Sequence, residues 1–216
     1  MIYGATGYTG RLAAARAQQQ GLSPVLAGRQ AEPLAPLAQH LGVEHRVFAL
    51  DDEDGMQRAL QGVGVLLNCA GQFLHTAAPL MGACLRRGVH YLDIAAELDS
   101  YLLAERLHPQ AVAAQVMLLP GCGGSVPMLG DLAAHAVEQV ATPVSLRIAL
   151  HVSGAMSRGS AVSAGQNLSA HCLVREHDVL TPRDRQPLRD FNFGRFQAAA
   201  SRSRCRTWSP SRARAA

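Results

Sequence analysis

The chain has 216 residues, of which 48% are hydrophobic, 17% charged and 5% aromatic, and its formal net charge is +4. This apolar content excludes a chain that is disordered throughout, and the lack of any uncharged apolar run of about 18 residues excludes a transmembrane helix in the sequence. All basic residues are Arg, and six of them follow residue 190, where no acid occurs, so the basic excess belongs to the tail and does not predict a nucleic-acid surface.

The first predicted elements are a strand over residues 1–3, a glycine-rich turn, and a helix over residues 11–20. Three residues are short for a central strand, where about five or six are usual, which suggests that residues upstream of it are missing. This order of strand, GxxGxxG turn and helix is typical of sites in which the helix N-terminus binds a pyrophosphate. The alternative is that the glycine-rich segment is a plain tight turn without a ligand. The pattern predicts a dinucleotide site that includes Gly4, Thr6, Gly7, Tyr8, Thr9 and Gly10.

A second strand is expected over residues 24–28, and it ends in Gly28 and Arg29. Enzymes that use NAD usually carry an acid at this point for the ribose 2′-hydroxyl, whereas the Arg guanidinium suits a 2′-phosphate. Gly28 and Arg29 are therefore predicted to bind the cofactor, and the cofactor is predicted to be NADP. The alternative is a solvated Arg at the end of a strand.

Strands and helices continue to alternate along the chain. Strands are expected over 45–50, 63–69, 89–94 and 116–119, and helices over 32–41, 56–60, 76–87, 98–114 (interrupted near Pro109) and 130–140. This order predicts an α/β fold with a doubly wound parallel sheet of the Rossmann type, whose ligands lie at the carboxyl ends of the strands. Three more residues at such ends are predicted to contact the cofactor: Asp51 at the adenine, and Ala70 and Gly71 at the nicotinamide half. Asp52 to Asp54 fit a helix N-cap equally well.

The pattern changes after residue 142. Residues 1–142 are predicted to form the nucleotide-binding domain, and residues 143–195 the beginning of a mixed α+β second domain for substrate binding or dimerisation. Within it we expect a strand over 144–152, a loop over 153–159 and a helix over 160–172. Residues 196–216 are predicted to be a disordered tail rich in Ala, Arg and Ser. Candidate substrate contacts near the loop are His151, Ser153, Ser157 and Arg158, of which the last could bind a carboxylate.

The sequence does not single out a catalytic residue. Tyr91, Asp93 and Glu97 lie at or just beyond the carboxyl end of the fifth strand and are placed for proton transfer, although a core-edge Tyr and an N-cap explain them as well. Cys122 lies before a helix whose N-terminus would stabilise a thiolate, as in the thioester chemistry of N-acetyl-glutamyl-phosphate reductase, which the Pro-Gly-Cys segment resembles. A small buried thiol is the alternative. The absence of Lys excludes Schiff-base, P-loop and Tyr-x-x-x-Lys chemistry.

Several segments together resemble the NADP-binding domain of saccharopine dehydrogenase-like oxidoreductases, a group that includes trans-acting enoyl reductases. These segments are Gly4–Gly10, Leu26–Arg29, Leu67–Gly71, His90–Asp93 with Glu97, and Pro120–Gly123. The resemblance covers residues 1–195 and implies an NADP-dependent oxidoreductase that transfers hydride to or from an unidentified small-molecule or acyl substrate. It implies that Gly4, Gly7, Gly10 and Arg29 hold NADP. Gly124 and Ser125 stand where many members have an aromatic residue and an acid, and the lack of Lys makes saccharopine an unexpected substrate.

Two other functions stay open, a non-catalytic NADP-binding sensor and a truncated remnant. Members of the group continue well past position 216, and the change of composition after Gly194 suggests truncation or a change of reading frame. Five widely spaced Cys residues without a metal-ligand pattern, together with the lack of a signal-peptide pattern, predict a cytoplasmic protein without a metal site. The expected partner is a small-molecule substrate, with no nucleic acid and no membrane, and a homodimer is consistent with the predicted second domain.

Overall fold

The computed structural model describes residues 1–151, 172–176, 179–183, 189–194 and 197–200. The chain divides into two compact units, of which the first contains residues 1–126 and the second contains the described residues from 127 onward. The division falls early in the helix α6 (Ser125–Glu138), whereas the sequence places a boundary after residue 142. That domain boundary stays a prediction.

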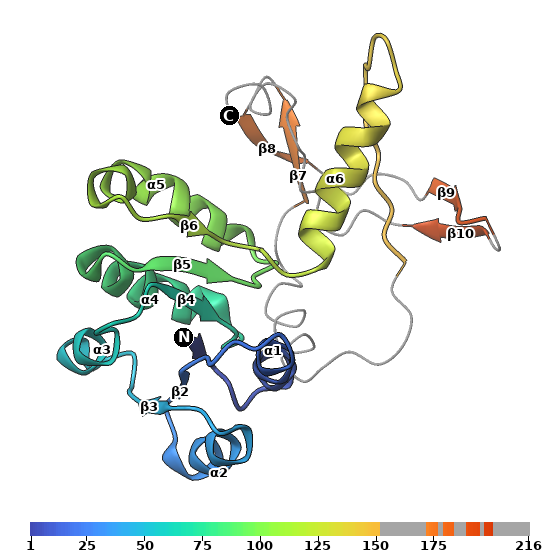
Figure 1. Cartoon of the computed structure of the whole chain (residues 1–216). Helices are drawn as coiled ribbons and strands as arrows, with labels where there is room; N and C mark the ends of the chain where they lie inside the picture. The colour runs from blue at the N-terminus through green and yellow to red at the C-terminus, as the bar shows by residue number, and fades with distance from the viewer. Residues whose placement is uncertain (152–171, 177–178, 184–188, 195–196, 201–216) are drawn as a thin grey trace. The chain divides into compact units, whose positions relative to one another are not determined.

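The first unit is built on six parallel strands in the order β3-β2-β1-β4-β5-β6 (Figure 1). The order runs outward from β1 in both directions, so the predicted doubly wound sheet of the Rossmann type is confirmed. The strands are β1 (Ile2–Tyr3), β2 (Leu26–Gly28), β3 (His45–Val47), β4 (Val65–Asn68), β5 (His90–Asp93) and β6 (Leu118–Leu119). Tyr3 of β1 is paired with Ala27 of β2 on one side and with Asn68 of β4 on the other, so these three strands end at the same edge of the sheet.

Helices pack on both faces of this sheet. They are α1 (Tyr8–Gln19), α2 (Ala31–Leu41), α3 (Glu53–Ala59), α4 (Phe73–Arg87) and α5 (Leu98–Ala114). The helix expected over 11–20 begins three residues earlier, which places Tyr8 to Gly10 in its first turn. The expected interruption of α5 near Pro109 is wrong, because the exposed proline lies within the continuous helix.

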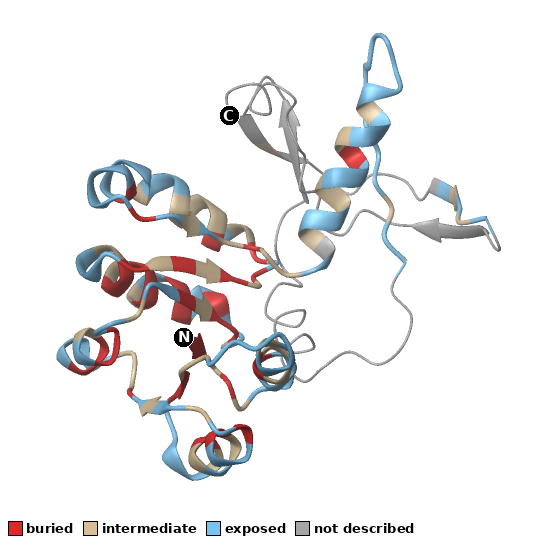
Figure 2. Ribbon diagram, viewed as in Figure 1, coloured by how far each residue is buried: buried red, intermediate tan, exposed pale blue. Residues whose placement is uncertain are grey.

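Two separate apolar cores follow from the alternation of side chains along each strand. Ile2 and Leu26 pack in one core with residues of α1 and α2, whereas Tyr3 and Ala27 pack in the other with residues of α3 and α4. Figure 2 shows the buried residues concentrated along the strands and on the inner helix faces. Even a two-residue central strand therefore contributes to both layers of the core.

In the second unit, the described strands form two antiparallel pairs. One pair is β7 (Cys172–Glu176) with β8 (Val179–Arg183), and the other is β9 (Arg189–Asn192) with β10 (Gln197–Ala200). Antiparallel pairing together with α6 agrees with the expected mixed α+β character. In the part of the chain that the structure describes, no helix is long and apolar enough to cross a membrane.

Three predictions for this unit need correction. Residues 144–151 form no strand, because among the described residues their alternating apolar side chains have no strand to pair with, and Val144 is 92% exposed. Cys172, expected to end a helix, begins β7 instead, while residues 160–171 lie outside the described residues. Residues 197–200, expected to be disordered, form β10 because their backbone pairs with β9, and residues 201–216 lie outside the described residues.

Candidate functional site

The glycine-rich turn joins β1 to α1 within a few residues. Gly4 has a φ of +77°, and its N–H donates to the carbonyl oxygen of Ala27 at 2.9 Å. The N–H of Gly7 donates to the carbonyl oxygen of Gly4 at 3.0 Å, and the carbonyl oxygen of Thr6 accepts a bond from Arg11 Nε at 2.9 Å. These bonds hold the start of α1 close to the carboxyl end of β1.

Two glycines of this turn are required by close backbone packing. A Cβ on Gly4 would lie 2.6 Å from the backbone nitrogen of Ala70 and 2.8 Å from its Cα. A Cβ on Gly10 would overlap the carbonyl oxygen of Gly4 and lie 2.8 Å from the Cα of Ala5. The turn thus brings α1 against β1 and the loop after β4, as predicted for a helix that packs closely on a strand.

The N-terminus of α1 faces this site without a protein cap. Its N-cap is Gly7, no side chain of the described residues caps it, and its first turn holds no acid. Gly7, Tyr8 and Thr9 are exposed. Because the first N–H groups of a helix lack partners within it, this end is suited to an anion such as a pyrophosphate.

Arg29 and Asp51 lie at the same end of the sheet. Both side chains are exposed, and the charges of both affect the pKa of the Tyr3 hydroxyl. Burial raises this pKa to about 12, the positive charge of Arg29 lowers it, and the negative charge of Asp51 raises it. Among the described residues the buried Tyr3 hydroxyl has no hydrogen-bond partner. Gly28 is buried next to Arg29, and no described atom lies within 4 Å of the position that its Cβ would take.

The acids after β3 have separate roles. Asp52 is the N-cap of α3, and its Oδ1 accepts a bond from the N–H of Gly55 at 2.8 Å. The N-cap interpretation is therefore confirmed for Asp52. Asp51 precedes the cap and takes no part in it, so its predicted contact with adenine stays a prediction.

A cavity of about 230 Å³ opens at the carboxyl end of the sheet. It lies between the first turn of α1, the loop after β5 and the turn after β6, and its lining residues are Thr9, Ile94, Ala95, Ala96, Gly123, Gly124 and Val126. Of these residues only Thr9 is a predicted cofactor contact, whereas Gly123 and Gly124 enter the sequence analysis only through the family resemblance. The available signal was the run of small residues after each strand, which is typical of backbone that approaches a ligand closely.

The loop after β4 contacts the glycine-rich turn beside this end. Ala70 is half-buried, approaches Gly4 as described above, and donates its N–H to Asn68 Oδ1 at 3.0 Å, while Gly71 is exposed. The structure thus brings Gly4, Gly7, Gly10 and Ala70 together. Arg29 and Asp51 lie with them at the carboxyl ends of the strands.

The candidate acids and bases in β5 and the loop that follows it are buried rather than exposed. Tyr91 and Asp93 are fully buried, and the Tyr91 hydroxyl donates to Asp93 Oδ2 at 2.9 Å. Burial raises the pKa of both groups. The carboxylate of Glu97 accepts a bond from the N–H of Ala96 at 2.9 Å, and the residue is the N-cap of α5. These contacts favour the structural interpretation over proton transfer to a substrate.

Cys122 does not have the properties of an activated nucleophile. It is half-buried, its N–H donates to the carbonyl oxygen of Asp93 at 2.8 Å, and α6 begins only at Ser125. Burial raises the pKa of its thiol, and the charge of Asp93 raises it further. A raised pKa and a helix that begins three residues further on do not favour the predicted thiolate at this position.

The candidate substrate residues of the second unit lie mostly outside the described residues. Ser153, Ser157 and Arg158 belong to that group. His151 is described, and its ring lies against that of Phe193 with the centroids 5.7 Å apart. No group of three His, Cys, Asp or Glu side chains that could hold a metal occurs in the described ranges.

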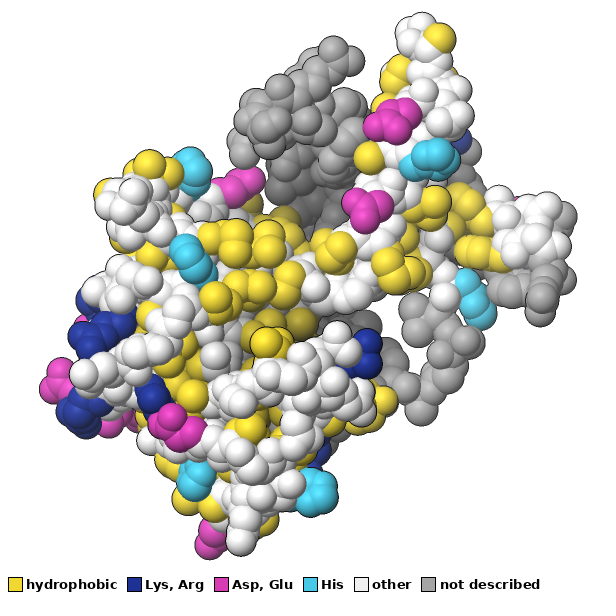
Figure 3. Space-filling model, viewed as in Figure 1, with side chains coloured by type: hydrophobic (Ala, Val, Ile, Leu, Met, Phe, Trp, Pro, Cys, Tyr) yellow, Lys and Arg dark blue, Asp and Glu magenta, His cyan; other side chains and the backbone are white. Residues whose placement is uncertain are grey.

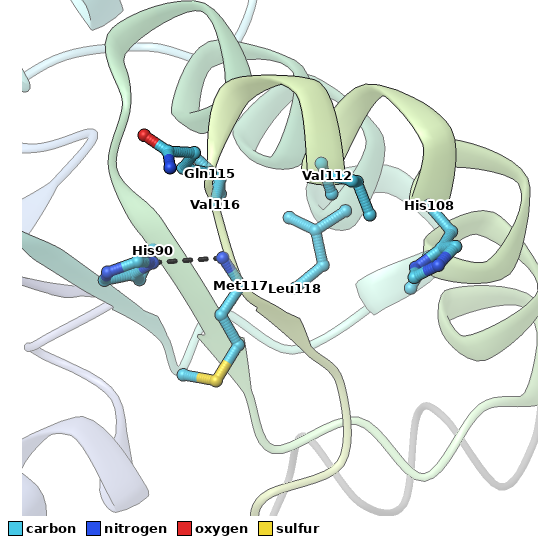
Figure 4. A pocket seen from close by; sticks show the side chains of 9 residues that line it. His90, His108, Val112, Gln115, Val116, Met117 and Leu118 are labelled. Carbon is cyan, nitrogen blue, oxygen red and sulfur yellow. Dashed lines mark hydrogen bonds between the residues drawn. The ribbon is translucent and has the colours of Figure 1, made fainter. Parts of the chain in front are cut away.

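A larger cavity, of about 450 Å³, lies at the opposite end of the strands. Figure 4 shows its lining, where His90 at the start of β5 accepts at Nδ1 a bond of 3.0 Å from the N–H of Met117, which directly precedes β6. Figure 3 shows apolar side chains gathered along the edge strand β6, and Val112, Met117 and Leu119 are 63%, 47% and 43% exposed. This cavity is separate from the glycine-rich turn.

Comparisons with known proteins agree with this geometry. The family described as "Saccharopine dehydrogenase NADP binding domain" matches residues 1–119. A trans-acting enoyl reductase of Mycobacterium leprae is 33% identical over 136 residues, and one of Mycobacterium tuberculosis (strain H37Rv) is 30% identical over 142 residues. Each match covers 59% of this chain and 32% of the relative, so the chain spans about a third of the length of these curated relatives.

A solved structure supports the same fold. Saccharopine dehydrogenase (L-Glu forming) from Saccharomyces cerevisiae superposes with a TM-score of 0.56 at 14% identity, over 64% of this chain and 30% of that chain. At this identity the likeness shows the fold alone. The predicted resemblance is confirmed by the family match, which covers more than half of the sequence. The chain therefore belongs to the saccharopine dehydrogenase family and carries its NADP-binding domain.

Proposed function

We propose that this chain binds NADP(H) at the carboxyl ends of its parallel strands and acts as an NADP-dependent oxidoreductase. The observation that carries the proposal is the exposed Arg29 at the end of β2, beside a glycine-rich turn whose helix N-terminus has no side-chain cap among the described residues. Together they offer a site for a pyrophosphate and a site for a 2′-phosphate.

Each part of the dinucleotide has a matching feature in this chain. The N–H groups at the start of α1 would bind the pyrophosphate, and the open space above Gly28 would admit the ribose. Arg29 would pair with the 2′-phosphate, and the exposed Asp51 would meet the adenine. Past Ala70 and Gly71, the nicotinamide half would enter the cavity of about 230 Å³.

The chain's own contribution to the reaction is positioning. NADPH supplies a hydride when it is bound. The small residues that line the cavity, Ala95, Ala96, Gly123 and Gly124, would allow a flat ring to approach the backbone closely. The relatives are named enoyl reductases, which favours a carbon–carbon double bond of an acyl substrate as the group that accepts the hydride.

The proposal is tested by titrating NADPH and NADH against the wild type, Arg29→Ala and the control Arg16→Ala, with nicotinamide fluorescence as the readout. Arg16 is also exposed but lies in the last turn of α1, so its loss changes the net charge equally, away from the site. We expect the wild type to prefer NADPH, and Arg29→Ala to lose about tenfold or more in NADPH affinity, because a charge-assisted hydrogen bond contributes about 1.5–3 kcal/mol.

The control should keep the wild-type preference. Equal affinity of the wild type for the two nucleotides would refute the assignment of NADP. An unchanged preference in Arg29→Ala would refute the role of this side chain.

A further inference from the structure

Three polar side chains at the ends of β4 and β5 form a continuous hydrogen-bonded relay inside the first unit. Asn68, Tyr91 and Asp93 are each 0% exposed. Asn68 Nδ2 donates to the Tyr91 hydroxyl at 3.1 Å, and this hydroxyl donates to Asp93 Oδ2 at 2.9 Å. Buried polar groups destabilise a fold unless they are paired, so this relay needs the partners that the following loops supply.

The relay holds the loops that follow three adjacent strands. Asp93 Oδ1 accepts bonds from the N–H groups of Ala95 at 2.8 Å and Gly121 at 2.7 Å. At the other end, Asn68 Oδ1 accepts a bond from the N–H of Ala70 at 3.0 Å. The loops after β4, β5 and β6 are thus attached to one set of buried side chains.

Two of these loops form walls of the cavity. Ala95 lines it directly, and Gly121 leads into Gly123 and Gly124, which also line it. Asp93 is not among the lining residues, but its Oδ1 accepts bonds both from Ala95, which lines the cavity, and from Gly121, which lies two residues before the lining Gly123. This carboxylate therefore links the loop after β5 to the loop after β6.

We propose that Asp93 is a positioning residue, whose buried carboxylate sets the width of the cavity and thereby the affinity of the chain for the nicotinamide half of NADP(H). The proposal rests on the proposed function, because it assigns the cavity to that half. The side chain acts through Ala95 and Gly121 and does not itself contact the cofactor.

Substitutions at this position separate its possible effects. Asp93→Ala removes the acceptor and leaves both loop N–H groups without their shared partner. Asp93→Asn keeps one oxygen that can accept both bonds, and its amide meets the Tyr91 hydroxyl instead. Tyr91→Phe leaves the bonds from Ala95 and Gly121 in place and serves as a control for the loss of the relay alone.

The experiment compares two probes on the full chain by calorimetry. NADPH contains the nicotinamide half, whereas adenosine 2′,5′-bisphosphate contains the 2′-phosphate half alone. For Asp93→Ala we expect NADPH to bind about tenfold more weakly and the bisphosphate to bind within about twofold of the wild type. Asp93→Asn and Tyr91→Phe should bind NADPH within about threefold of the wild type. A purely structural role would not change the ratio of the two affinities.

Several results would overturn the proposal. An equal loss for both probes in Asp93→Ala means that Asp93 supports only the fold, and an unchanged NADPH affinity means that it does not shape the cavity. If the wild type binds the bisphosphate but gains no affinity from the nicotinamide half, the proposal fails while NADP recognition stands. If the wild type binds neither probe, the proposed function fails as well. If Asp93→Ala does not fold, Asp93→Glu replaces it in the experiment, because its longer side chain keeps the carboxyl group but displaces both loops. A loss of NADPH affinity without a loss of bisphosphate affinity would then support the proposal, and equal changes for the two probes would refute it.

Discussion

Replacing Gly4 with Ala tests whether the end of β1 must lie directly against the loop after β4. The φ of Gly4 is +77°, a conformation that costs an Ala residue about 1–2 kcal/mol. The added Cβ would lie 2.6 and 2.8 Å from the backbone nitrogen and Cα of Ala70, and 2.9 Å from the carbonyl carbon of Cys69. All three neighbours are backbone atoms and cannot rotate away, so overpacking adds about 1–3 kcal/mol.

Gly21 supplies a matched control for the conformational part of this loss. Its φ is +76°, almost the same as that of Gly4, and no described atom lies within 4 Å of the position of its Cβ. Gly21→Ala should therefore lose about 1–2 kcal/mol of unfolding free energy, and Gly4→Ala about 2–5 kcal/mol. The difference between the two variants, about 1–3 kcal/mol, corresponds to roughly 2–12 °C in Tm for a chain of this size.

Urea unfolding followed by far-UV circular dichroism measures both losses on the same scale, provided that the transition has a single step. Equal destabilisation of Gly4→Ala and Gly21→Ala would refute the close approach. It would show that the strain of a left-handed residue accounts for the whole effect and that the loop at Cys69 and Ala70 has room to move.

Two further predictions follow from Gly28 and Asp93. Gly28→Ala should keep the wild-type unfolding free energy within about 0.5 kcal/mol, because the added Cβ meets no described atom. The same variant should bind NADPH more weakly in a fluorescence titration, and unchanged binding would contradict a cofactor beside Gly28. Burial raises the pKa of Asp93 above its ordinary value of 3.8, so the folded state holds this proton more tightly than the unfolded state. The unfolding free energy of the wild type should therefore fall relative to that of Asp93→Asn as pH rises from 3.8 through the raised pKa, as measured by urea unfolding at several pH values; a constant difference would contradict the shift.

The sequence was informative wherever a property depended on neighbours in the chain. The spacing of Gly4, Gly7 and Gly10 and the alternation of apolar segments predicted six parallel strands in a doubly wound sheet, because glycine turns and hydrophobic periodicity are local signals. The N-cap at Asp52 was readable for the same reason.

The remaining features depend on contacts between distant segments. The apolar alternation over residues 144–152 predicted a strand, but a strand also needs a partner, which local periodicity does not provide, and the described residues 144–151 form none. The relay from Asn68 to Asp93 joins three strand ends that are adjacent only in the folded sheet. The environment of Cys122 has the same origin, since its pKa is raised first by burial and then by Asp93, which lies on a strand distant in the sequence.

The burial of Asp93 and the exposure of Arg29 have a consequence for how such a site can change during evolution. Under the proposed function Arg29 selects the nucleotide, and because this side chain is exposed, its replacement would change that preference without disturbing the core. Asp93 is 0% exposed, and its partners lie on two different loops, so a new cavity shape requires several coordinated substitutions. If the site binds NADP(H) as proposed, a single substitution at Arg29 can change the choice of nucleotide, whereas a change in the geometry of the cavity requires several substitutions together.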